Sequence, residues 1–262
     1  MFKNNAFRTL SKFITLLALT SISCGVSGLP FLATETPTPT LTFTPSPTST
    51  PSATPTLTST PTPLPTGRIT EEQSDGTTLF TDYDAGYKIA FPKNWVAVIP
   101  SEQDIQNLLT SFPDQEQNIS SIMELIKNSG GDIYRVFAFN FKATDKTYTP
   151  NINIAYQENI ALSAVPMEDF LAANLELLPS LGIEATNSGI KETSSGLETG
   201  FVDLKWTMNV TESQKIDLTQ KQVYFKSGEG MVVVTISRTT SNPFDFAADV
   251  ETLIESIQLL GD

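Results

Sequence analysis

The feature that most limits how this chain can fold is a threonine- and proline-rich segment, residues 34–66. It contains 14 Thr, 9 Pro and 4 Ser among 33 residues, too few apolar side chains to bury a core. Proline fixes φ near the polyproline value and has no N–H to donate, so helix and sheet are both disfavoured. We therefore predict an extended, solvated spacer, which reaches on the order of 100 Å at about 3.1 Å per residue. Its dense hydroxyl groups also make it a candidate for O-glycosylation.

The residues before this spacer have the pattern of an export signal. Three basic residues, Lys3, Arg8 and Lys12, precede a short apolar run, 13–19. The uncharged stretch continues to Ala33, which is about the length of a membrane span, but hydroxyl side chains, Gly and Pro interrupt it. We interpret residues 1–23 as a secretory signal peptide.

The end of this signal, Ser21-Ile22-Ser23-Cys24, resembles a bacterial lipobox, in which small residues precede a Cys that is acylated and becomes the first residue. Ile22 and Ser23 fit the usual pattern, whereas Ser21 stands where Leu is commonest. The resemblance implies that Cys24 is the lipid attachment site. Residues 24–66 are then a lipid-anchored stalk on the extracytoplasmic face of the bacterial cell membrane. Ordinary secretion after cleavage near Ala33 and a retained signal anchor are the alternatives.

The remaining residues, 67–262, are long enough for one domain of moderate size. They carry 28 Asp and Glu against 13 Lys and Arg, a net charge of −15, and the chain has no His and one Cys. The lack of His excludes Ser-His-Asp chemistry and His-ligated metals, and a single Cys excludes an intrachain disulfide or a Cys cluster. The acidic balance argues against nucleic acid and anionic lipid as partners of the folded part. We expect no cofactor.

The hydrophobic pattern after Thr77 alternates between strands and helices. A hairpin is expected to turn at Asp84-Ala85-Gly86, and Ser101 with Asp104 forms an acidic capping box. The order of elements predicts an α+β fold, with one sheet covered by helices. The expected strands are 79–82, 87–91, 95–99, 133–141, 151–157, 202–210, 216–226 and 231–237, and the expected helices are 101–111, 115–128, one opened by Pro166 and one starting at Asn242-Pro243.

Short motifs resemble a known family. Tyr87-Lys88-Ile89-Ala90-Phe91-Pro92-Lys93-Asn94-Trp95 resembles the opening Tyr-x-Ile-x-Phe/Tyr-Pro-x-x-Trp motif of PsbP-like domains. Residues 150–154 and 167–170 resemble their middle strand and helix, and 223–259 their ending. The resemblance covers nearly all of 77–260. It implies the α/β/α sandwich of PsbP, the Ran-binding Mog protein and the bacterial DcrB lipoproteins, a mainly antiparallel sheet flanked by helices, and the role of a small non-enzymatic accessory module.

Catalytic motifs are incomplete. Ser188-Gly189-Ile190-Lys191 matches S-x-x-K and Lys226-Ser227-Gly228 resembles the K-T-G element of penicillin-binding proteins, but S-D-N is missing. We interpret the two matches as loop and hairpin turn. Asp82-Tyr83-Asp84-Ala85-Gly86 begins like a calcium loop but lacks the later ligands and the distal Glu, and a hairpin turn explains the same residues.

Two further residue pairs have a structural and a functional interpretation. Glu168 and Asp169 form a carboxylate pair, but acidic residues are also favoured in the first turn of a helix. Trp95 and Trp206 are able to stack on a ligand, but their apolar alternation favours core packing. We favour the structural interpretation of both pairs.

Taken together, these residues predict a non-enzymatic, lipid-anchored accessory or binding module of the cell envelope. We expect it to be monomeric, to contact the membrane through Cys24 and to bind an envelope protein. No residue is assigned to catalysis, a cofactor or a metal. One alternative is an enzyme that uses carboxylates alone, such as a glycosidase, because paired Asp/Glu chemistry needs no His. Another is a domain that binds divalent cations, suggested by the charge of −15.

Overall fold

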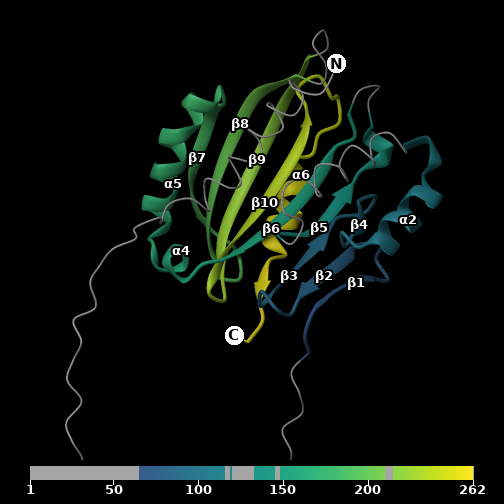
Figure 1. Ribbon diagram of the computed structural model, residues 1–262, viewed down its shortest axis with the longest axis horizontal. Coiled ribbons are helices and arrows are strands. Elements are labelled where there is room, and N and C mark those ends of the chain that lie inside the picture. Colours follow the sequence, from purple (N-terminus) through teal and green to yellow (C-terminus); the bar gives the residue numbers. More distant parts are fainter. Residues whose placement is uncertain (1–64, 116–118, 120–132, 145–147, 210–214, 262) are drawn as a thin grey trace, which may run out of the picture.

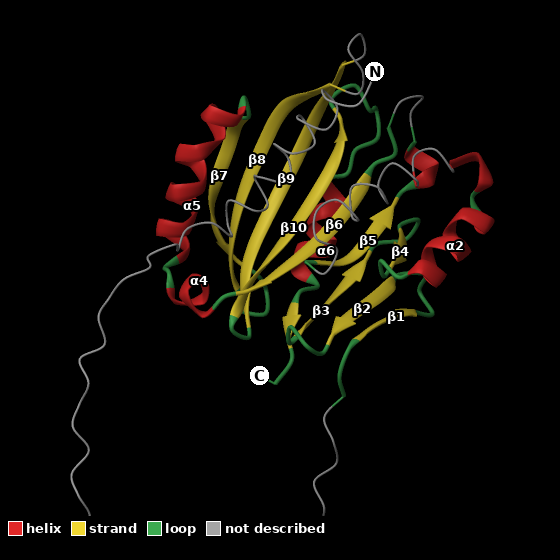
Figure 2. Ribbon diagram, viewed as in Figure 1, coloured by secondary structure: helices red, strands yellow, loops and turns green. Residues whose placement is uncertain are grey.

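A computed structural model gives the fold, and it describes residues 65–115, 119, 133–144, 148–209 and 215–261 (Figure 1). The predicted signal peptide, Cys24, nearly all of the stalk and most of the predicted helix at 115–128 lie outside these residues. The described part contains helices and antiparallel strands, so the predicted α+β class is confirmed (Figure 2). None of its helices has both the length and the apolar character needed to cross a bilayer.

The larger sheet has seven strands in the order β4-β5-β6-β10-β9-β8-β7, and every neighbouring pair is antiparallel. Its three longest strands, β8, β9 and β10, pair in succession. The predicted strands are confirmed, whereas β7 was not predicted. The strands are β4 (Val96–Val98), β5 (Tyr134–Phe139), β6 (Asn151–Glu158), β7 (Glu184–Glu192), β8 (Glu198–Asn209), β9 (Lys215–Ser227) and β10 (Gly230–Thr239).

The smaller sheet has four strands in the order β1-β2-β3-β11. Its centre is the predicted hairpin of β2 (Thr78–Asp82) and β3 (Tyr87–Phe91), in which Gly86 has a φ of 77°. β1 (Arg68–Glu72) and β11 (Gln258–Leu259) were not predicted. β1 has one apolar residue, Ile69, and is mostly exposed, so it lacks the alternation that marks a half-buried strand.

Among the described residues, four α-helices accompany the sheets: α2 (Glu102–Ser111), α4 (Ile160–Ala164), α5 (Met167–Leu177) and α6 (Ala247–Glu255). The Ser101 side chain accepts a hydrogen bond from the Asp104 N–H, as the capping box predicts. The predicted start of the last helix at Asn242-Pro243 was wrong. Asn242 is buried and bonds to the Phe244 N–H, and it is Asp245 that accepts from the first helical N–H, that of Ala247.

The elements form three layers. On β9, Tyr224 packs against Phe170 of α5 at 5.1 Å between ring centroids, whereas Val223 and Phe225 belong to the core under α6 and the small sheet. Leu108 of α2 packs on the same face as α5, beside Phe137 and Phe139. The predicted sandwich is therefore present with one difference: one outer layer combines α6 with the four-stranded sheet.

Candidate functional site

A groove of about 440 Å³ lies between α6 and the strands β7 to β10. Its apolar surface consists of Phe201, Val223, Ile236, Phe246, Ala247, Val250 and Ile254. These side chains come from the α6-facing side of the large sheet and from the sheet-facing side of α6. A concave apolar surface of this size with a few polar groups is the usual form of a small-ligand site.

Charged side chains of both signs line the same groove. The Lys221 ammonium lies 2.7 Å from Oδ1 of Asp203, its cross-strand partner, and 4.6 Å from the centroid of the Phe201 ring. Both charged side chains are about a quarter exposed. Lys221 is therefore held at the groove by an ion pair and an aromatic face.

A second ion pair ties β7 to α6. Lys191 Nζ contacts Glu251 and lies 3.1 Å from Oε1 of Glu255, while the other Glu255 oxygen accepts from the Ser194 N–H at 2.7 Å. These contacts raise the pKa of Lys191, mainly through its hydrogen bond to Glu251. The pKa of the Glu255 carboxyl is lowered, first by the hydrogen bond from the Ser194 N–H. Both side chains thus keep their charges at neutral pH.

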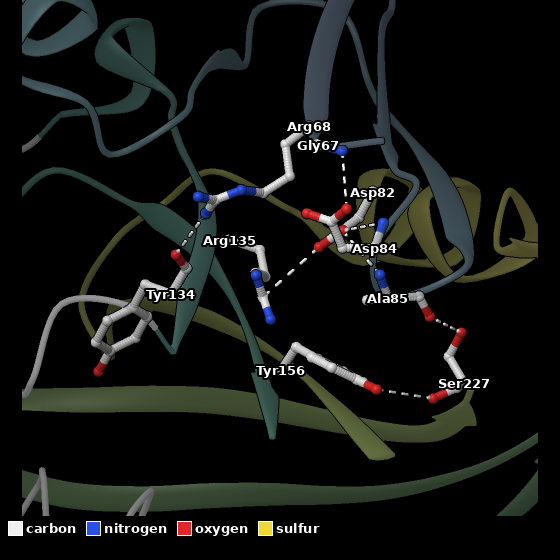
Figure 3. Close-up of polar contacts among 9 residues, drawn as sticks. All are labelled: Gly67, Arg68, Asp82, Asp84, Ala85, Tyr134, Arg135, Tyr156 and Ser227. Atoms are coloured by element: carbon white, nitrogen blue, oxygen red, sulfur yellow. Dashed lines mark hydrogen bonds and ion pairs between the residues drawn. The ribbon is translucent and has the colours of Figure 1, made fainter. Parts of the chain in front are cut away.

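A separate buried polar cluster joins the two sheets (Figure 3). Asp82 at the end of β2 is fully buried, and its Oδ2 lies 3.6 Å from Nε of Arg135 on β5. The β5–β6 register shifts between Tyr134 and Val136, so Arg135 occupies a bulge that turns it toward β2. Its guanidinium carbon lies 5.0 Å from the centroid of the Tyr156 ring.

The possible calcium loop is a turn in the structure. Oδ1 of Asp82 accepts from the N–H groups of Asp84 and Ala85, and Asp84 accepts from the Gly67 N–H at 2.8 Å (Figure 3). Burial raises the pKa of Asp82 despite these bonds and the nearby Arg135. Within the described ranges, no group of three acidic or thiol side chains is placed to hold a metal ion.

Several buried polar atoms of this cluster lack a hydrogen-bond partner. Oδ2 of Asp82, Nε of Arg135 and the hydroxyl of Tyr87 are all buried without a hydrogen bond. Burial, followed by the charge of Asp82, raises the pKa of Tyr87 well above its ordinary value. Its closed surroundings and its position between layers give the cluster a structural role, whereas the groove is open to a ligand.

The other residues singled out from the sequence have structural roles in the described part. Trp95 is buried and donates through Nε1 to Asp249 at 2.8 Å, and Trp206 is half-buried and donates to Gln220 at 2.9 Å. Glu168 and Asp169 lie in the first turn of α5, as predicted. The two elements of the penicillin-binding motif lie on β7 and on the β9–β10 hairpin, where Ser227 Oγ donates to the Ala85 carbonyl at 2.6 Å.

Sequence reasoning did not find the groove. The alternation in β8 predicts that Asp203 lies on the opposite face from the apolar residues Val202 and Leu204. In the structure the apolar residues pack on α5, and the face that carries Asp203 turns toward α6. Lys221 carried no distinct signal, because β9 also contains Lys215, Asp217 and Lys226. The pairing of Asp203 with Lys221 needed the register of β8 and β9, which periodicity does not give.

No family model and no curated protein matches this chain. Solved structures that are similar to this chain include a cyanobacterial PsbP from Synechocystis, 10% identical with a TM-score of 0.38, covering 78% of this chain and 98% of that one. LpqN, described as involved in cell envelope biogenesis of Mycobacterium tuberculosis, is 9% identical with a TM-score of 0.39, covering 74% and 90%. A Pseudomonas aeruginosa protein of unknown function is 14% identical with a TM-score of 0.36, covering 43% and 74%. None of these likenesses assigns an activity to this chain.

Proposed function

We propose that this protein is a lipid-anchored accessory module of the bacterial cell envelope, which binds its partner in the groove under α6 and is not an enzyme. The observation that carries the binding role is the groove itself, with its apolar floor and its fixed charges. The location rests on the sequence: an export signal, the lipobox-like end at Cys24 and a stalk long enough to hold the domain away from the membrane.

The state of the carboxylates supports binding over catalysis. Asp203 is paired with Lys221, Glu251 with Lys191, and Asp245 accepts from the Ala247 N–H. A general acid or base must be free to approach the proton that it transfers, whereas each of these carboxylates already contacts another group of the protein. Fixed ion pairs of this kind give specificity to a binding surface.

Photo-crosslinking in living cells tests the binding role. Val250 lines the groove, so p-benzoylphenylalanine at this position should give one reproducible light-dependent adduct. Ile160 on α4 is 67% exposed and lies outside the groove, so the same replacement there is the matched control. Identical adducts from both positions, or random abundant proteins from Val250, would show that the groove does not bind a specific partner.

A carboxylate-only hydrolase, such as a glycosidase, is the second candidate, because Asp203, Asp245 and Glu251 line one groove. Assays with aryl glycosides separate the two functions. Hydrolysis by the wild type that is lost in both D245N and E251Q would favour the enzyme. Binding of divalent cations is the third candidate, and isothermal titration with calcium that gives no saturable heat would remove it.

A further inference from the structure

Arg238 differs from the other two cations of the groove. Lys221 and Lys191 each contact a carboxylate, whereas Arg238 has none within 4.0 Å among the described residues. One of its N–H groups, on Nη1, donates to the carbonyl oxygen of Asn242 at 3.2 Å. A guanidinium has five N–H donors, so Arg238 retains donors for a ligand.

The guanidinium is also held in place before any ligand arrives. Its carbon lies 6.0 Å from the centroid of the Phe246 ring. Asn242, whose carbonyl it contacts, is buried and fixed at both ends of its amide: Nδ2 donates to the Ala143 carbonyl at 2.9 Å and Oδ1 accepts from the Phe244 N–H at 3.0 Å. A preorganised donor loses little freedom on binding.

The surroundings of Arg238 are apolar on one side and acidic on the other. Ile236, two residues earlier on the same strand, and Val250 of α6 line the groove with it. Asp245 lines it as well, but this residue is exposed and its Oδ1 accepts from the Ala247 N–H at 2.9 Å. Asp245 has no cationic contact in the described ranges either, but it is exposed and screened by solvent, so Arg238 is the half-buried charge of the groove without an opposite contact.

We propose that the groove takes a small amphiphile with an anionic head, which Arg238 binds while the apolar body lies against Val223, Ile236, Val250 and Ile254. Arg pairs with carboxylate and phosphate oxygens through two parallel hydrogen bonds. A volume of about 440 Å³ suits a molecule of modest size. This inference rests on the proposed function, because it names the ligand class of the same groove.

Calorimetric titration of the full chain with three matched probes tests the inference: 4-phenylbutyrate, 4-phenylbutyl phosphate and the neutral 4-phenyl-1-butanol. At least one anion should bind ten times or more tightly than the alcohol, and the tighter of the two anions identifies the head group. In Arg238→Gln this preference should vanish while the affinity for the alcohol stays unchanged, which also shows that the groove is intact. Arg238→Lys should retain part of the preference for the anions, because an ammonium keeps the charge and loses the bidentate geometry.

Lys205→Gln is the charge-matched control, since Lys205 is exposed on β8 outside the groove and its loss should leave all three affinities unchanged. Equal affinity of the wild type for anions and alcohol would overturn the role of Arg238 and leave the groove as a binding site. A preference for the anions over the alcohol that persists in Arg238→Gln would overturn the role of Arg238 as well. If Arg238→Gln does not fold, a folded Arg238→Lys with undiminished preference counts against the proposal. If none of the probes binds, the inference of an anionic amphiphile is wrong, whereas the adduct at Val250 decides separately whether the groove binds a partner.

Discussion

Asp82 and Arg135 face each other across the boundary between the two sheets, with Oδ2 of the carboxylate 3.6 Å from Nε of the guanidinium. The carboxylate is fully buried, and its other oxygen accepts from the N–H groups of Asp84 and Ala85. The same side chain therefore forms the β2–β3 turn and attaches the small sheet to β5. Two substitutions of Asp82 distinguish its role in the turn from its role in the contact between the sheets.

Asp82→Ala should lower the free energy of unfolding by about 3 kcal/mol, because it leaves two N–H groups without their acceptor and the Arg135 guanidinium without its ion-pair partner. Asp82→Asn should cost roughly half as much, because an amide oxygen still accepts from Asp84 and Ala85. Asp75 also forms a turn, with Thr77, but it is exposed, so Asp75→Ala should leave the free energy of unfolding nearly unchanged. Urea unfolding measures all three. Wild-type stability in Asp82→Ala would contradict a role for this pair.

The pH dependence of stability should reveal the buried carboxyl. Burial raises the folded-state pKa of Asp82 above its ordinary value of 3.8, so the folded state binds this proton more tightly than the unfolded state. The wild type should therefore gain stability relative to Asp82→Asn as the pH falls through the raised pKa toward 3.8, with no further gain below it. Glu255, whose pKa is lowered, acts in the opposite direction below about 4.5 in both proteins and cancels in the comparison. A constant difference from pH 7 to 4 would show that the pKa of Asp82 is ordinary.

Trp95→Ala should cost about 3–5 kcal/mol, as other large-to-small core changes do. The side chain is buried, its ring lies 5.6 Å from that of Phe246, and its Nε1 donates to Asp249. Trp95→Phe keeps a ring and removes the hydrogen bond, so it should cost distinctly less. Chemical unfolding followed by circular dichroism measures both. A loss below about 1 kcal/mol in Trp95→Ala would place this residue on the surface and reopen a ligand-stacking role.

The domain should begin at Gly67. The Gly67 N–H donates to Asp84, its carbonyl accepts from the Tyr83 N–H, and β1 follows at once. A chain that starts at Gly67 should unfold in one cooperative transition at the melting temperature of longer forms. A chain that starts at Thr77 lacks β1 and should melt several degrees lower. If the chain from Gly67 is molten while one from Cys24 folds, the stalk belongs to the domain.

The parts of the fold that sequence predicted are those with local signals. Strand β8 alternates apolar and polar residues, and the β2–β3 hairpin turns at a Gly with positive φ. The start of α6 was placed four or five residues too early because Asn242-Pro243 looks like a cap, whereas the tertiary bond from Asn242 to the Ala143 carbonyl holds it in a loop. Arg238 could not be recognised, because its isolation from carboxylates depends on how β10 and α6 pack.

We propose that lipid on Cys24 anchors the protein outside the cytoplasm, and Cys24→Ala in the full chain tests this anchor. This change removes the only thiol and leaves the basic and apolar parts of the signal intact. Two acyl chains give stable membrane attachment, because each buried methylene contributes about 0.8 kcal/mol. The wild type should therefore partition into the detergent phase and incorporate a palmitate analogue, and the variant should do neither. Equal membrane retention without label in both proteins would indicate an uncleaved anchor, and release of both into the medium would indicate ordinary secretion. Either result would show that Cys24 does not carry the lipid anchor.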